Sequence, residues 1–100
     1  MSSVDHELRM AFRTGRIHLG SKVAIRELRR GRALMVILSS NFPSVIREEI
    51  DNYGKLSSVP VLHHQKDSMD LGILCGKPFP VSSLVISDPG DSKILDLARE

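Results

Sequence analysis

The sequence predicts an α/β fold, a three-layer α/β/α sandwich of about four strands. Two observations support this prediction. Segments with apolar residues at helical spacing alternate with short β-like runs in the order α-β-α-β-α-β-α-β-α. The most apolar run, ALMVIL at residues 33–38, has no polar position and ends in SSN, which is typical of a strand buried on both faces at the centre of such a sheet. No repeat or linker divides the chain, so we expect one domain over residues 1–100.

The first helix is expected at residues 4–14, where apolar side chains recur at helical spacing before a stop at Gly15. A short strand, RIHL at residues 16–19, follows it. Gly20 and Ser21 then open the second helix, and the Ser21 hydroxyl is the expected cap for its free N–H groups. These signals place a helix start directly after the first strand.

The second helix runs through KVAIRELRR to a stop at Gly31, and its two faces differ. Its apolar side chains group on one side and predict contact with the core. The basic side chains on another side are Lys22, Arg26, Arg29 and Arg30. The helix therefore combines a core face with a basic face.

A third helix is expected at about residues 43–57, after the central strand. Pro43 favours a helix start, and Ile46, Ile50 and Tyr53 recur at the spacing of an inward face. Arg47 belongs to the predicted outer face.

The last part of the chain predicts two strands and two short helices. VPVLHH (59–64) and SSLVIS (82–87) are the strands, and DSMDLGILCG (67–76) is the helix between them. The turn DPGDS leads into a final helix. The expected caps are Asp67 or Ser68 for the first of these helices and Asp91 or Ser92 for the second.

Composition and charge narrow the classes of function. The 41% hydrophobic and 26% charged content is near the average of a globular domain. Residues 1–32 hold eight Lys/Arg against three Asp/Glu, and residues 33–100 hold six against nine. Local basic charge of this kind indicates that a polyanion touches one side of the fold, or simply a solvated helix face.

Two further features concern the cellular compartment. The longest apolar run is far shorter than a membrane span, and the first residues lack the apolar core of a secretion signal, so we expect a cytosolic protein. The single cysteine, Cys75, is expected to be a small buried hydrophobic residue, because no partner exists for a disulfide.

Three loops hold the unusual residues: LGSK after the first strand, SSN after the second and GKPFPV before the last. Ligands of α/β sheets bind at strand ends, so we expect these loops to lie together. Pro78 and Pro80 fix Phe79 in a stretch that is neither helix interior nor central strand, so Phe79 is a loop aromatic.

Several kinds of chemistry are disfavoured. LGSK suits phosphate at a helix N-terminus, but the spacing of a P-loop is missing. His63 and His64 are adjacent on a strand and point to opposite faces, so they are poor ligands for one metal ion. No motif links Cys75 to a base. We therefore expect no enzyme, no metal, no cofactor and no small-molecule substrate.

RNA binding joins the remaining features best. Lys and Arg would meet phosphates, the Asn41 amide could bind a base edge, and Phe79 could stack on an unpaired base. The alternative for Phe79 is a ring tucked under its loop as part of the core. Another alternative for the whole protein is a protein-interaction adaptor of the same fold.

The string LGSK…GRALMVILSSNFPS…EEIDNYGKLSSVPVLHH…DLGILCGK…DPGDSKI resembles the kink-turn-binding family that includes ribosomal protein seven-a-e. The likeness runs from about residue 7 to residue 95. It implies a four-stranded mixed sheet, no catalysis, and binding to a kink-turn in ribosomal RNA within the large ribosomal subunit of the cytoplasm, beside other ribosomal proteins. A non-ribosomal RNA-binding protein of the same fold is the alternative.

The resemblance also implies roles for particular residues. Gly20 and Lys22 fall where the family approaches the RNA backbone, Asn41 where an asparagine contacts a kink-turn guanine, and Phe79 and Val81 where apolar loop residues pack on bases. The full set of expected RNA-binding residues is Gly20, Ser21, Lys22, Arg26, Asn41, Arg47, Lys77, Phe79 and Val81.

Three positions depart from the family. Ser40 replaces a frequent polar amide, and Ile46 and Pro80 replace frequent basic residues. Each change removes a donor or a charge from the RNA side, which predicts weaker affinity for an isolated kink-turn.

Overall fold

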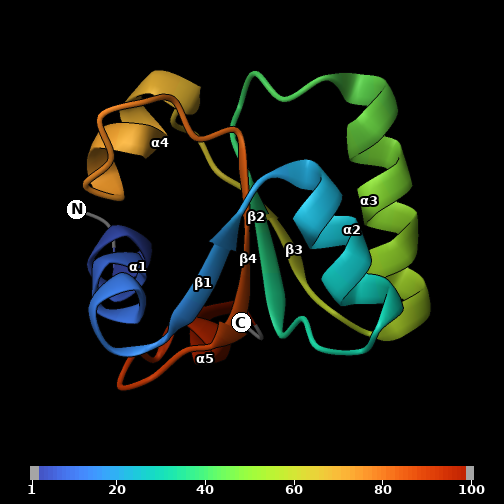
Figure 1. The fold of residues 1–100 in the computed structure, drawn as a ribbon, viewed down its shortest axis with the longest axis horizontal. Helices are drawn as coiled ribbons and strands as arrows, with labels where there is room; N and C mark the ends of the chain where they lie inside the picture. The colour runs from blue at the N-terminus through green and yellow to red at the C-terminus, as the bar shows by residue number, and fades with distance from the viewer. Residues whose placement is uncertain (1–2, 99–100) are drawn as a thin grey trace.

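The computed structural model describes residues 3–98, and the order of its elements is the predicted one (Figure 1). Its helices are α1 (Ser3–Thr14), α2 (Ser21–Arg29), α3 (Ser44–Ser57), α4 (Ser68–Leu74) and α5 (Ile94–Ala98). Its strands are β1 (Arg16–Leu19), β2 (Met35–Leu38), β3 (Val61–His63) and β4 (Ser83–Asp88).

The four strands form one mixed sheet in the order β1-β4-β2-β3. β4 runs antiparallel to both β1 and β2, whereas β2 and β3 are parallel. β2 lies in the interior of the sheet and all four of its residues are buried, which confirms the prediction from the unbroken apolar run.

Helices cover both faces of the sheet, with α2 and α3 on one and α1, α4 and α5 on the other (Figure 1). Successive strand residues point to opposite faces, so β2 serves two cores. Met35 and Ile37 pack with Leu8 of α1, while Val36 and Leu38 pack with Ile50 of α3. The predicted three-layer sandwich is confirmed.

Two local expectations were wrong. Gly20 occupies the cap position of α2, with no side-chain cap, so Ser21 is the first helical residue rather than the cap. Ile46 is 37% exposed instead of packing inward. The first turn of α3 projects past the strand ends in Figure 1, so the sheet does not cover this turn.

Candidate nucleic-acid interface

The loops predicted to lie together meet at one end of the sheet, where β1, β2 and β3 finish and β4 begins (Figure 1). Backbone hydrogen bonds join them. The Gly20 N–H donates to the Ser83 carbonyl oxygen at 3.1 Å, and the Ser39 N–H donates to the Ser82 carbonyl oxygen at 2.9 Å. The loops before α2 and α3 are thus both fixed to the segment that enters β4.

The N-terminus of α2 is a suitable site for an anion. Gly20 has a φ of 108°, a conformation that favours glycine, and a side chain there would meet no atom within 4 Å. No side chain caps the helix, and its first turn holds no acidic residue. Lys22 is exposed beside these free N–H groups. Helix dipole, free donors and lysine charge therefore all favour a bound phosphate.

The Asn41 side chain links the loop after β2 to the start of α4. Its Oδ1 accepts from the Ser39 hydroxyl at 2.8 Å and from the Ser68 N–H at 3.0 Å. Its Nδ2 donates to the Ser68 hydroxyl at 3.2 Å. An amide has two acceptor positions and two donor hydrogens, so these contacts fill the oxygen and leave one hydrogen of Nδ2 for a ligand.

Phe79 is 50% exposed and belongs to neither core cluster, so it is a loop aromatic as predicted and not a residue tucked into the core. The loop rests on α4 at Gly72, where a methyl group would overlap the Phe79 carbonyl oxygen. Gly72 is a residue whose importance sequence reasoning missed, although a glycine inside a helix is itself a signal of close approach.

Val81, which is expected to pack on bases, is buried. Its N–H donates to the Ser68 carbonyl oxygen at 2.9 Å, and its side chain is 3% exposed within the core cluster that includes Leu71. A side chain buried to this degree offers almost no surface to a base. Val81 therefore anchors the loop that presents Phe79.

Two of the basic residues expected to bind RNA, Lys77 and Arg47, are partly buried in different parts of the protein. Lys77 is partly buried, and its Nζ lies 5.8 Å from the centre of the Phe12 ring of α1. Arg47 is also partly buried, in the second turn of α3. Ser40 is exposed, and its N–H donates to the Lys66 carbonyl oxygen at 2.9 Å.

The basic face of α2 is divided. Arg26 is exposed, with its Nε 3.5 Å from a carboxylate oxygen of the buried Glu27. Arg29 turns toward α3, where its Nη2 donates to the Tyr53 hydroxyl at 2.8 Å and its guanidinium lies 5.3 Å from the ring centre. Arg29 is thus withdrawn from the face that Lys22 and Arg26 share.

The histidines and the cysteine occupy separate environments. The Nε2 of His63 lies 3.0 Å from Asp51 of α3, whereas the Nε2 of His64 lies 2.8 Å from Asp5 of α1. Within residues 3–98, no three His, Cys, Asp or Glu residues gather as a metal site would require. Burial raises the pKa of the Cys75 thiol to about 11, and this residue packs in the core as predicted.

A groove of about 780 Å³ opens at the other end of the sheet, where β2 and β3 begin and α3 ends. It contains none of the residues expected to bind RNA. Within the described part of the chain, no helix has both the length and the apolar character needed to cross a membrane.

Comparison with known proteins gives a family match over most of the chain. Residues 2–96 match the model described as the ribosomal protein L7Ae/L30e/S12e/Gadd45 family. Among curated proteins, the large ribosomal subunit protein eL30 of Methanothermobacter thermautotrophicus is 46% identical over 94% of this chain and 96% of its own length. The eL30 protein of Saccharolobus solfataricus is 41% identical over 98% of this chain and 91% of its own length.

Among solved structures, a Bacillus halodurans C protein of unknown function has the same fold. The two superpose with a TM-score of 0.80 over 97% of this chain and 95% of the other, at 22% sequence identity. This likeness supports the α/β sandwich.

Proposed function

This chain belongs to the ribosomal protein L7Ae/L30e/S12e/Gadd45 family, and on that premise we propose that it binds and stabilises a kink-turn in ribosomal RNA. Its curated relatives match almost the whole chain and are proteins of the large ribosomal subunit. The chain therefore has a structural role in the ribosome and is not an enzyme. The observation that carries the proposal is the meeting of three segments at one end of the sheet: the α2 N-terminus, the loop that contains Asn41 and the loop that contains Phe79.

The phosphates of the bent RNA would bind at the start of α2. The free N–H groups after Gly20 donate to phosphate oxygens, and Lys22 adds a positive charge. The absence of a side chain at Gly20 leaves room for close approach of the RNA backbone. Arg26, one turn further along the same face, extends the positive surface.

Asn41 would contact a base as a hydrogen-bond donor. Its Oδ1 already accepts two hydrogen bonds within the protein, so only the second hydrogen of Nδ2 is left for RNA. That donor suits the O6 and N7 acceptors of guanine. The bonds to Ser39 and Ser68 hold the amide in place before RNA arrives, which lowers the entropy cost of binding.

Phe79 would stack on a base that the kink removes from the helical stack. Half of the side chain is exposed, and the prolines on both sides restrict the backbone that carries it. Stacking on an aromatic ring tolerates any base, so the specificity would come mainly from the shape of the RNA.

We also propose, as implied by the family, that residues 1–100 form one kink-turn RNA-binding domain. Its partners are ribosomal RNA and neighbouring ribosomal proteins of the large subunit, in the cytoplasm. This role needs no cofactor and no small-molecule substrate.

The test is a fluorescence titration of the protein against a kink-turn RNA and a straight duplex of equal length and charge, at two salt concentrations. We expect tighter binding to the kink-turn at both, because base contacts and shape are screened less than phosphate contacts. A Leu56→Ala variant serves as the control, since this exposed side chain lies at the far end of α3.

Equal binding to the two RNAs that fades with salt would refute kink-turn recognition. In that case the departures at Ser40, Ile46 and Pro80 would be the first positions to restore to the residue types frequent in the family. Saturable binding to a protein, with no preference between the RNAs, would favour the adaptor alternative.

A further inference from the structure

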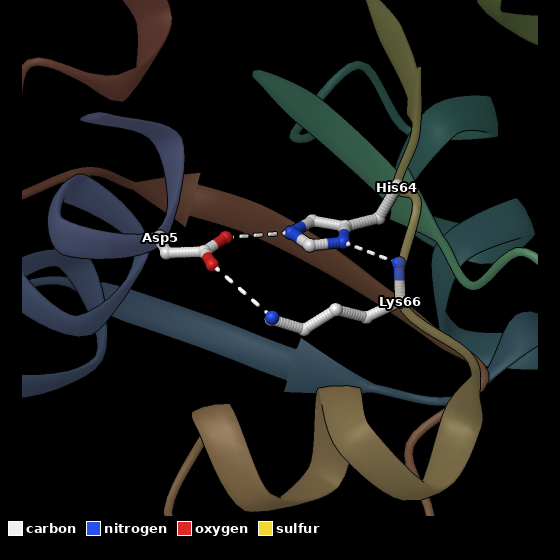
Figure 2. Close-up of polar contacts among 3 residues, drawn as sticks. All are labelled: Asp5, His64 and Lys66. Atoms are coloured by element: carbon white, nitrogen blue, oxygen red, sulfur yellow. Dashed lines mark hydrogen bonds and ion pairs between the residues drawn. The ribbon is translucent and has the colours of Figure 1, made fainter. Parts of the chain in front are cut away.

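His64 lies directly after β3, between Asp5 of α1 and the backbone of Lys66 (Figure 2). Its Nε2 is 2.8 Å from Asp5 Oδ1, and its Nδ1 accepts from the Lys66 N–H at 3.0 Å. The Lys66 ammonium lies 3.6 Å from Asp5 Oδ2. The His64 side chain is only 8% exposed, so the contacts of its ring are shielded from water, whereas the Lys66 side chain is 40% exposed.

The contacts define which ring nitrogen carries the proton. A backbone N–H can only donate, so Nδ1 of His64 must be the acceptor. The proton of the neutral ring therefore lies on Nε2, which donates it to the Asp5 carboxylate. Asp5 thus selects the tautomer that is able to hold the Lys66 N–H.

The fixed backbone at Lys66 reaches the residue proposed to contact guanine. The Lys66 carbonyl oxygen accepts from the Ser40 N–H at 2.9 Å, and Ser40 directly precedes Asn41. Two residues after Lys66, Ser68 binds the Asn41 side chain through its N–H and its hydroxyl. Residues 64–68 therefore hold the Asn41 loop at two successive positions.

We propose that His64 is a positioning residue for RNA recognition, with Asp5 setting its ring tautomer: His64 fixes the turn at residues 64–66, which in turn holds Asn41 in the orientation that meets the base. This inference rests on the proposed function. It goes beyond that function because neither residue would touch RNA, and Asp5 acts from a helix on the other side of the histidine (Figure 2). The competing explanation is that the network only attaches α1 to the body of the protein.

Two substitutions separate the turn contact from the α1 contact. His64→Asn keeps an acceptor two residues before Lys66, as in an Asx-turn, but is too short to reach Asp5. His64→Leu keeps an apolar bulk and loses both contacts. We expect kink-turn affinity to fall roughly 3- to 10-fold in His64→Leu, the range that one hydrogen bond supplies, and to recover most of that loss in His64→Asn.

The matched control is His63→Leu at the adjacent position. His63 also has an aspartate partner, Asp51 at 3.0 Å, but this pair joins β3 to α3 and does not contact the turn. We expect His63→Leu to leave kink-turn affinity within about 2-fold of the wild type.

A double-mutant cycle with Asn41→Ala tests whether His64 acts through Asn41. If it does, His64→Leu costs no further affinity once Asn41 is alanine. Independent losses that multiply, or an equal loss in His64→Asn and His64→Leu, would overturn the proposal. Melting temperatures of all variants identify any that fail to fold.

Hydrogen exchange of the Ser40 and Ser68 amides in the RNA-free protein separates this inference from the proposed function. We expect faster exchange at both amides in His64→Leu and protection close to wild type in His64→Asn. Unchanged protection in His64→Leu would overturn positioning even if the kink-turn is bound. Conversely, the wild-type protein could show no preference for the kink-turn while His64→Leu exchanges faster at both amides. That result would refute the proposed function and still support the link between the turn and Asn41.

Discussion

Replacing Phe79 by alanine separates RNA binding from folding. The side chain is 50% exposed, and full burial of a phenylalanine side chain is worth about 1.5–3 kcal/mol, so its folded contacts supply about 1 kcal/mol. For a domain of this size such a loss lowers the melting temperature by about 4–8 °C. Loss of stacking on one base costs about 1–3 kcal/mol of binding, which is about 5- to 150-fold in affinity.

The assay is the titration of Phe79→Ala against the kink-turn RNA, with thermal unfolding of the same preparations. The control is Leu56→Ala, which removes an 83% exposed apolar side chain at the end of α3 and is expected to change neither quantity. Affinity within about 2-fold of wild type, together with a melting point lowered by well over 8 °C, would refute the reasoning, because the ring would then act in the core.

Three other changes follow from the same structure. Lys22→Ala should weaken RNA binding and reduce the slope of log K against log salt by about 1, and an unchanged slope would place Lys22 outside the interface. Gly72→Ala should lower both the melting temperature and the RNA affinity, because the new methyl group overlaps the Phe79 carbonyl oxygen. Thermal unfolding followed by circular dichroism and the RNA titration measure these two quantities, and wild-type values for both would contradict the prediction. Burial raises the pKa of the Cys75 thiol from 9.0 to about 11, so as the pH rises the thiol ionises first in the unfolded protein. The free energy of unfolding should therefore fall between about pH 9 and 11. Denaturant titrations measure this fall, and Cys75→Ala should lack the part of it that comes from the thiol.

The order of elements could be predicted because local signals agreed with the fold. Glycines follow the ends of α1, α2 and α4, the apolar run marks the interior strand, and Asp67 caps α4 by accepting from the Asp70 N–H at 2.9 Å. The meeting of three loops also followed from the sequence, because alternating helices and strands leave their loops at the ends of the sheet.

The orientation of single side chains could not be predicted in the same way. Phe79 and Val81 look alike in sequence, as apolar residues of one loop, yet one is half exposed and the other is core. The difference comes from the hydrogen bond between Val81 and Ser68, thirteen residues earlier in the chain. Lys77 similarly turns to Phe12, a neighbour from the first helix.

The contacts of His64 show the same limit more strongly. The sequence showed only that the adjacent histidines are poor ligands for one metal ion, and it assigned His64 no partner. The partner that fixes the ring, Asp5, lies 59 residues away in sequence. No local pattern identifies such a pair, because it depends on how α1 packs against the end of β3.

The helix starts at the candidate interface differ in how their free N–H groups are capped, and therefore in how well they suit an anion. α2, α3 and α4 all begin at this end, so all three present the positive end of their dipoles there (Figure 1). α4 is closed to an anion because the Asp67 carboxylate already caps it, whereas α2 and α3 have neither a side-chain cap nor an acidic residue in the first turn. In the proposed interface, phosphate attraction would therefore come from α2 and α3, and base contacts would come from Asn41 and Phe79, which lie around α4. These two contributions use different parts of this end of the sheet. Phe79→Ala should therefore lower RNA affinity without changing the slope of log K against log salt. Lys22→Ala should change that slope and keep the preference for the kink-turn over the straight duplex.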